Sequence, residues 1–282
     1  MIVILSNTKI SASINTIGAE LMKLEKNNRN YIWTVDETYW NKTSPILFPI
    51  VGQLKNDSYK LNNKSFELPR HGFARNFEFK IKNKIRNSAL FSLKSNFETL
   101  QQFPFEFELK IEYRLAKNSL EISYLVSNKS NEVMPFSIGA HPAFNLEKTI
   151  TAYSLVFNNT TDEFITHCLA NNHFNNTTKK INSNNGTVDL NYTLFEKDAL
   201  VFKHLKSNQV ILKEKEKAII KITFDDFPYL GIWTKPNASF ICIEPWCGLA
   251  DNINHNGNIM KKEGINILQP NESFQRKIKI EI

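Results

Sequence analysis

The 282 residues, 41% apolar and 22% charged, are typical of a folded globular protein with a sizeable core. No apolar run approaches membrane-spanning length, and the N-terminus lacks the basic start of a signal peptide. The net charge of +7 comes from lysines scattered among asparagines, without a basic stripe or a nucleic-acid-binding motif, so we expect no membrane or nucleic-acid partner.

Alternation of apolar and polar residues with a period of two dominates the chain and predicts β-strands. It begins at residues 10–14 and returns at 77–81. The clearest example covers residues 105–127, where apolar residues alternate with charged ones up to Leu115. The polar residues 116–119 then turn the chain, and the alternation resumes at Leu120. This pattern predicts a β-hairpin with one face on a core and one in water.

Residues 171–191 are rich in asparagine and threonine, and we expect a surface excursion there. Strand patterns return at 200–203, 218–224, 240–244 and 278–282. No segment longer than three turns has convincing helical periodicity, and no repeat or long linker interrupts the chain. We therefore predict one all-β domain over residues 1–282, a mostly antiparallel sandwich of many strands.

Three segments marked by glycine, proline and aromatic residues carry candidate chemistry. His71 lies between Arg70 and Arg75 and directly before a glycine, which tolerates unusual backbone angles. His141 precedes a proline, which favours an extended backbone. Glu244 follows an apolar strand, so we expect partial burial and a raised pKa suited to a general base. The alternatives are histidines that hydrogen-bond loops and a carboxylate paired with a lysine or arginine.

Other chemistries have weaker support in the sequence. The four remaining histidines lie in polar surroundings or at the end of a strand, where we expect solvated or structural roles: His167, His173, His204 and His255. No two of His71, His141 and Glu244 share a short ligand spacing, so we expect no metal. No nucleophile elbow or phosphate-cradling loop is present. Three cysteines cannot complete a disulfide set, which favours a reducing compartment and a cytoplasmic protein.

At these segments the chain is similar to the aldose 1-epimerase, or galactose mutarotase-like, superfamily, and within it to the LacX-like branch. The similarity runs nearly end to end and is carried by segments 18–21, 31–33, 45–52, 70–75, 135–145, 230–236 and 243–246. It implies a galactose mutarotase-like β-supersandwich with an open sugar-binding cleft. It also implies an isomerase that interconverts the α and β anomers of an aldohexose without a cofactor.

The resemblance assigns roles to the candidate residues. Glu244 would be the general base for the C1 hydroxyl, His141 the general acid at the ring oxygen, and His71 a supporting hydrogen-bond donor. The expected substrate-binding set is Arg70, Arg75, Asp198, Asn145, Trp233 and Trp246. Phe73 and Phe144 would also present flat faces to a sugar, with core packing as the alternative for every aromatic. Gln53 stands where related sequences often have an arginine, which leaves the identity of the sugar open.

Two further functions remain open at this point. Arg70, Arg75 and Lys55 would form an anion site in a hexose-6-phosphate mutarotase. The other possible function is not enzymatic: a carbohydrate-binding or sensor protein that does not convert its ligand. The combination of an acid and a base argues against it, because binding alone needs neither. The expected partner is a small sugar, and the expected assembly is a monomer or homodimer.

Overall fold

The computed structural model describes residues 1–282, and it is mostly β-structure with one α-helix, α1 (Phe97–Gln102). Every pairing between named strands is antiparallel. The predicted all-β, mostly antiparallel fold is therefore confirmed. Helix α1 is short, and its N-terminus is capped by reciprocal hydrogen bonds between Asn96 and Thr99. No helix is long and apolar enough to cross a membrane.

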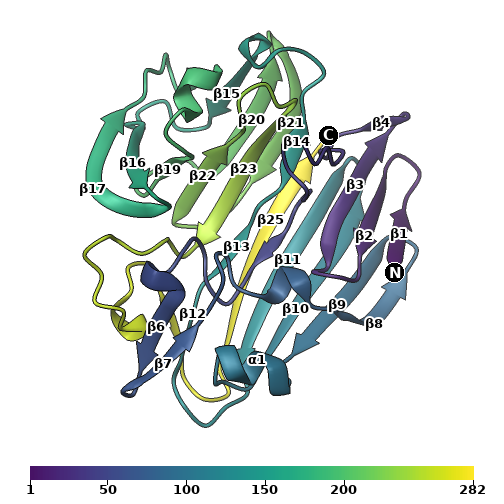
Figure 1. Ribbon diagram of the computed structural model, residues 1–282. Helices are drawn as coiled ribbons and strands as arrows, with labels where there is room; N and C mark the ends of the chain where they lie inside the picture. The colour runs from purple at the N-terminus through teal and green to yellow at the C-terminus, as the bar shows by residue number, and fades with distance from the viewer.

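The largest sheet has nine strands and forms the back of the molecule (Figure 1). Its order is β18 (Thr187–Asp189), β15 (Tyr153–Phe157), β20 (Gln209–Glu214), β21 (Lys217–Thr223), β25 (Ser273–Glu281), β11 (Ser119–Asn128), β10 (Phe107–Ala116), β9 (Ser88–Lys94) and β8 (Lys80–Ile85). The predicted hairpin at 105–127 is the β10–β11 pair, in which Leu115 lies opposite Leu120. The pattern at 77–81 ends in β8, and that at 278–282 lies in β25.

Two further sheets pack in front of the nine-stranded sheet (Figure 1). The N-terminal sheet has the order β1 (Ile2–Ser6), β2 (Ser11–Asn15), β3 (Glu20–Lys26) and β4 (Arg29–Asn30). The six-stranded sheet contains β19 (Leu200–Phe202), β22 (Tyr229–Trp233), β23 (Phe240–Cys247), β13 (Ile138–Ala140) and β5 (Ile46–Leu47), with β14 (Ala143–Asn145) also on β23. Three two-stranded ribbons complete the fold: β6 (Ser58–Leu61) with β7 (Lys64–Glu67), β12 (Met134–Phe136) with β24 (Asn266–Leu268), and β16 (Ile165–Ala170) with β17 (His173–Lys180).

One apolar cluster of 65 buried residues fills the space between these sheets. Phe48, Phe73 and Phe107 meet within it, with ring centroids 5.0–6.2 Å apart. Tyr113 on β10 crosses the layer and donates its hydroxyl hydrogen to the carbonyl of Ala19 at 2.6 Å. This hydrogen bond satisfies a buried polar group and ties the N-terminal sheet to the large one.

The expected surface excursion at 171–191 is wrong in part. Residues 173–180 form β17, and Phe174 is buried against Leu249 and Ala250 rather than exposed. Figure 1 shows the β16–β17 ribbon curving along the side of the six-stranded sheet. The asparagine-rich composition obscured two strands, β17 and β18, which bury Phe174 and Val188 respectively.

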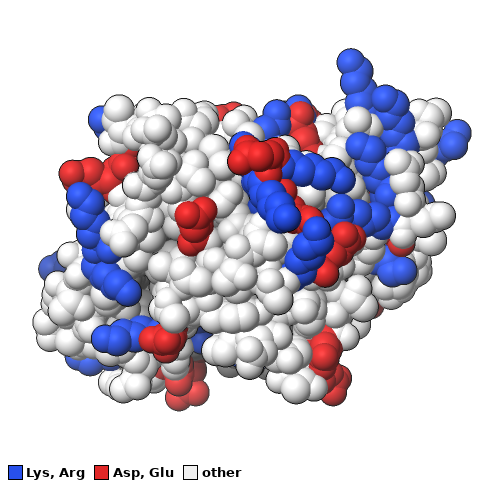
Figure 2. Space-filling model, turned by 90° about the horizontal axis from the view of Figure 1, so that it is seen from above, with Lys and Arg blue, Asp and Glu red and all other residues white.

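Charged side chains lie mainly in mixed groups on the surface. In the view of Figure 2, basic side chains gather toward one side, and several acidic side chains lie among them. The ion pairs Lys148–Glu214 and Lys221–Glu281 are examples of mixed charges on the surface. The local positive charge of these lysines is therefore offset by near neighbours.

Candidate active site

A pocket of about 270 Å³ lies on the open face of the six-stranded sheet. It brings together eight of the nine predicted site residues: Arg70, Arg75, His71, His141, Asp198, Trp233, Glu244 and Trp246. The strand register explains how segments distant in sequence meet here. Because successive side chains on a strand alternate between faces, Glu244 and Trp246 on β23 face the same side.

His141 and Glu244 face each other across a gap in the β-ladder. β13 pairs Gly139 with Trp246, and β14 pairs Ala143 with Cys242. Residue 141 therefore lies opposite residue 244 between the two pairings. The following residue, Pro142, has no N–H to continue the ladder. As a result, Nε2 of His141 lies 3.2 Å from Oε2 of Glu244.

Burial determines the charge of this pair. His141 is 8% exposed and Glu244 is 1% exposed. Burial raises the pKa of Glu244 well above its usual range, with the charge of Arg70 opposing the shift and that of Asp198 adding to it. Burial, assisted by Arg70, lowers the pKa of His141 to about 3. Both shifts favour the uncharged form of the pair, in which Glu244 is protonated and the imidazole of His141 is neutral.

Two buried polar atoms of this cluster, Nδ1 of His141 and Nε1 of Trp246, have no hydrogen-bond partner. The polar contact of Oε2 of Glu244 is the one with Nε2 of His141, at 3.2 Å. Because unpaired polar atoms are uncommon in protein interiors, their concentration at one site indicates a place for a polar ligand.

Aromatic rings hold the His141 imidazole in place. Trp40 stacks on it with ring centroids 4.8 Å apart and an interplanar angle of 26°. Trp233 meets it edge-on at 5.8 Å. Trp40 was missed in the sequence, although a large aromatic residue in the polar stretch 36–43 is a usable signal.

Trp246 forms the floor of the pocket because two glycines make room for its indole. A Cβ on Gly139 would lie 2.7 Å from its ring, and one on Gly231 would lie 2.5 Å from it. Trp233 and Trp246 thus line the pocket, as expected. Phe73 and Phe144 instead lie in the core, so core packing accounts for these two.

His71 is held in a strained backbone conformation beside the pair. Its φ is +68°, which is uncommon for any residue other than glycine. Its backbone N–H donates to the carbonyl of Gly52 at 2.8 Å, and the Gly52 N–H donates to its Nδ1 at 3.1 Å. Burial, then the charges of Arg70, His141 and Arg75, lowers the pKa of His71 well below its usual range.

The proton of neutral His71 is best placed on Nε2. A neutral imidazole has one N–H, yet Nε of Arg70 also lies 3.2 Å from Nε2 of His71. The Gly52 amide is fixed in the backbone, whereas the arginine side chain is free to move. We therefore assign the lone pair to Nδ1 and the N–H to Nε2, which makes His71 a donor.

The pocket contains cations without carboxylate partners. Arg70, Arg75 and Lys235 line it, and none of them takes part in an ion pair within 4.0 Å. Arg70 donates instead to Oδ1 of Asn172 at 2.8 Å, and Arg75 donates to the carbonyl of Arg70 at 2.7 Å. Asn172, a lining residue that the sequence did not indicate, belongs to the misjudged 171–191 segment.

The remaining predicted residues have mixed positions. Asp198 lines the pocket with a φ of +116°, and its Oδ1 accepts from the Ala199 N–H at 2.7 Å. Gln53 does not line the pocket, because its amide donates to Asp57. Lys55 is also outside the lining, so Lys235 replaces it among the nearby cations.

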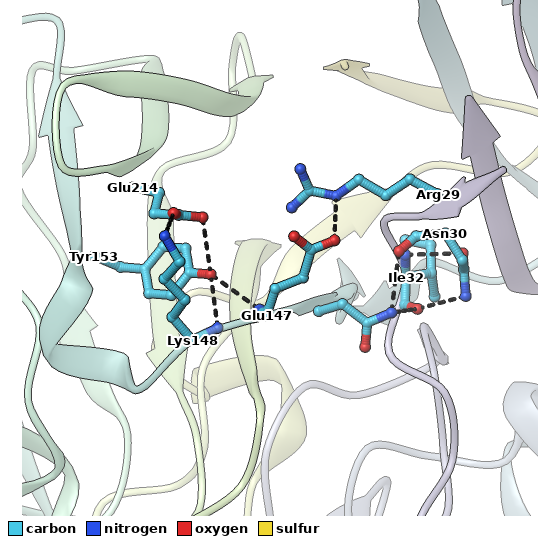
Figure 3. A network of polar contacts seen from close by, with 8 residues as sticks. Arg29, Asn30, Ile32, Glu147, Lys148, Tyr153 and Glu214 are labelled. Atoms are coloured by element: carbon cyan, nitrogen blue, oxygen red, sulfur yellow. Dashed lines mark hydrogen bonds and ion pairs between the residues drawn. The ribbon is translucent and has the colours of Figure 1, made fainter. Parts of the chain in front are cut away.

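Asn145 is the predicted site residue that lies elsewhere. Its Nδ2 donates to the carbonyls of Asn30 and Ile32 at 3.1 and 2.7 Å, which binds β14 to the N-terminal sheet. A neighbouring network continues this connection through the Arg29–Glu147 ion pair toward Lys148, Tyr153 and Glu214 (Figure 3). The substrate-binding role expected for Asn145 therefore has no support from its position.

A buried ion pair braces the loops around the pocket. Nζ of Lys262 lies 2.6 Å from Oδ1 of Asp251, and both side chains are 1% exposed. Oδ2 of Asp251 accepts from the Lys55 N–H, and the Asp251 N–H donates to the carbonyl of Gln53. The Asp251 carbonyl accepts from the N–H of Phe174. One carboxylate residue thus joins the segment next to His71 to the β17 wall.

Comparison with known proteins agrees with the fold and shows the family of the chain. The family model described as aldose 1-epimerase matches residues 1–281. The chromosomal protein LacX of Lactococcus lactis subsp. lactis is 35% identical over 93% of this chain and 92% of that protein. A galactose mutarotase related enzyme from Lactobacillus acidophilus has a TM-score of 0.93 at 32% identity, covering 100% and 97% of the two chains. A galactose mutarotase-like protein from Lactobacillus casei has a TM-score of 0.94 at 30% identity, covering 100% and 99%.

Lys262→Met should lower the free energy of unfolding by about 3–5 kcal/mol, because it leaves the Asp251 carboxylate buried and unpaired. Urea unfolding followed by circular dichroism measures the change. The exposed neighbour provides a control: Lys261→Met should change stability by less than about 0.5 kcal/mol. Equal stabilities of the two variants would contradict the bracing role.

Proposed function

The chain belongs to the aldose 1-epimerase family, and we propose that it is an isomerase that interconverts the α and β anomers of a free aldohexose. The observation that carries the proposal is the contact of a buried carboxyl group with a buried imidazole in a pocket the size of one sugar ring. Anomer exchange needs a proton removed from one oxygen and another delivered to its neighbour, so it needs such a pair.

The proposed reaction begins with Glu244 as a carboxylate and His141 as an imidazolium. Glu244 takes the proton from the C1 hydroxyl while Nε2–H of His141 delivers a proton to the ring oxygen. The bond between C1 and the ring oxygen breaks, and C1 becomes the carbonyl carbon of the open aldehyde. After rotation about the C1–C2 bond, the two proton transfers run in reverse and close the ring on the other face.

Burial favours the protonation state of the open-chain intermediate. After ring opening, Glu244 carries a proton and His141 is neutral. The pKa directions of the unliganded pair favour the same state, since burial raises the pKa of Glu244 and lowers that of His141. The starting ion pair has the same total number of protons, so no exchange with solvent is needed. Hydroxyl dipoles of the bound sugar would help to stabilise its separated charges.

The other lining residues fit roles in positioning the sugar. His71 would donate from Nε2 to the ring oxygen or an adjacent hydroxyl and stabilise the open form. Trp246 and Trp233 would pack against C–H groups of the ring. Asp198 would accept from a hydroxyl, and Arg70 would donate to one.

A hexose 6-phosphate is the second candidate substrate. The specific observation in its favour is that Arg70, Arg75 and Lys235 line the pocket without acidic partners. Unpaired cations of this kind are typical of phosphate sites. A binding protein without turnover would account for the pocket but not for the buried acid–base pair.

Glu244→Gln and His141→Asn should each slow anomer exchange by about 10²–10⁴-fold, because each removes one proton-transfer group. Polarimetry or NMR of freshly dissolved α-glucose and α-galactose measures the rate after subtraction of the spontaneous reaction. Glu216→Gln, on a fully exposed side chain, is the matched control. Full activity of Glu244→Gln would exclude Glu244 as the base, and a wild type no faster than buffer would exclude the enzymatic function.

The pH profile should be flat across neutrality. The activity needs one proton on the pair. As the pH falls toward the lowered pKa of His141, about 3, the imidazole is protonated while Glu244 keeps its proton. As the pH rises above the raised pKa of Glu244, the carboxyl group loses its proton while His141 stays neutral. kcat/KM should therefore change little between about pH 5 and the onset of the alkaline decline. A loss of activity centred near the ordinary histidine pKa of about 6.5 would contradict the shared-proton pair.

Free glucose or galactose should have a higher kcat/KM than glucose 6-phosphate. Lys235→Met should then change kcat/KM for the free sugars less than about threefold, since removing a rim charge changes the binding of a neutral ligand little. Lys217→Met is the exposed control. A preference for glucose 6-phosphate, combined with a tenfold or larger loss in Lys235→Met for this substrate alone, would favour the phosphate alternative.

A further inference from the structure

Cys242, a residue of a type that can bind metal ions, lies beside the acid–base pair of His141 and Glu244. Ligand atoms of His141, Cys242 and Glu244 all lie within 4.8 Å of one another. Cys242 precedes Glu244 by two residues on β23, so the two side chains face the same side. The sequence did not indicate this set, because Cys242 and Glu244 lie on β23 whereas His141 lies between β13 and β14 and meets them only through the pairing of those strands with β23.

We propose that His141, Cys242 and Glu244 form a binding site for a thiophilic divalent cation such as Zn²⁺, which inhibits by occupying the acid–base pair. Imidazole nitrogen, thiolate sulfur and carboxylate oxygen are all common zinc ligands. Tetrahedral coordination at ordinary zinc–ligand distances separates ligand atoms by about 3.5 Å. The 3.2 Å between His141 and Glu244 is already close to this value. The other separations between ligand atoms are at most 4.8 Å. Small side-chain rotations that shorten them would complete the three-residue site.

The charges and the open side of the pocket also suit such an ion. One thiolate and one carboxylate would neutralise a divalent cation, so that Arg70 would not face a net positive charge. Binding would release two protons, one from the thiol and one from the Glu244–His141 pair. The pocket leaves room for water as a fourth ligand. The ion would take the place of the proton shared between Oε2 of Glu244 and Nε2 of His141.

The surroundings suggest a regulatory or inhibitory ion rather than a structural one. Zinc-binding histidines usually donate their second ring nitrogen to a carbonyl or carboxylate. Nδ1 of His141 has no such partner. We therefore expect weaker binding than at a structural zinc site. The ion would also engage the lone pairs that the proposed reaction needs, so it and the sugar would exclude each other.

Direct metal binding tests this inference independently of any activity. The full-length, untagged protein is titrated with Co²⁺ and its absorption recorded, and Zn²⁺ affinity is measured by competition with a chromophoric chelator. We expect a sulfur-to-cobalt charge-transfer band that Zn²⁺ abolishes. Cys242→Ser and Cys242→Ala should both lose the band and bind Zn²⁺ at least about tenfold more weakly. Circular dichroism of both variants shows whether they are folded.

Matched controls separate this site from other ligands on the protein. Cys247→Ser alters the other buried cysteine of β23 and should retain the band and the affinity. His204→Gln removes one member of the surface pair His167–His204, whose ring centroids lie 5.9 Å apart, and should also leave both unchanged. A cobalt complex without the band, or zinc affinity lost in His204→Gln but retained in Cys242→Ser, would overturn the inference.

A competition experiment then connects the ion with catalysis and rests on the proposed function. Zn²⁺ should inhibit anomer exchange competitively with the sugar, and a chelator should reverse the inhibition. The inhibition constant should rise at least about tenfold in Cys242→Ser relative to Cys247→Ser. Purely noncompetitive inhibition would overturn the shared position of ion and sugar. A protein that binds cobalt through Cys242 but turns over no sugar would refute the proposed function and not the metal site.

Discussion

The contact between His141 and Glu244 places two ionisable groups across a pair of strands, in a space that water barely reaches. Burial penalises charge on both groups at once, so the favoured arrangement is a neutral pair that shares one proton. A proton that moves within the pair changes no total charge. The site can thus alternate between an acid–base form and a neutral form without drawing protons from solvent, provided that the 3.2 Å geometry is maintained.

Rigid packing and a buried polar brace maintain that geometry. Trp40 stacks against the imidazole, while glycines at 139 and 231 make room for the indole of Trp246 in the pocket. Asp251 holds the loop that fixes His71 at its positive φ, a conformation that costs about 1–3 kcal/mol. This strained conformation is maintained because hydrogen bonds from two neighbouring segments hold the loop around His71 in place. A site built in this way gives little freedom to its acid–base groups and more to the arginines at its rim.

Local patterns in the sequence predicted the parts of the structure that depend on local rules. Period-two alternation predicted the β10–β11 hairpin, and the three marked segments contributed six of the eight predicted residues that line the pocket. Trp40, Asn172 and Phe174 escaped prediction because only tertiary packing brings them to the pocket. Asn145 lies outside the pocket lining although it shares a segment with His141, because four residues of extended chain separate the two by about 13 Å. Likewise, the spacing of residues along one segment could not show that His141 lies beside Cys242 and Glu244, the other two ligands of the proposed metal site, because only the pairing of strands brings the three together.

The unpaired arginines have a second physical role that needs no anionic substrate. The positive charge of Arg70 lowers the pKa of His141 and also opposes the rise in the pKa of Glu244. It therefore favours a stronger acid at His141 and moderates the cost of an ionised base at Glu244. In the proposed reaction, the first effect would help His141 to give its proton to the ring oxygen, and the second would help to keep Glu244 ionised before it accepts the proton of the C1 hydroxyl. An acidic partner would screen this field, so the lack of one is consistent with a neutral sugar as well as with a phosphate. The cations alone thus do not identify the substrate, whereas the contact between the acid and the base supports the proposed chemistry for either sugar.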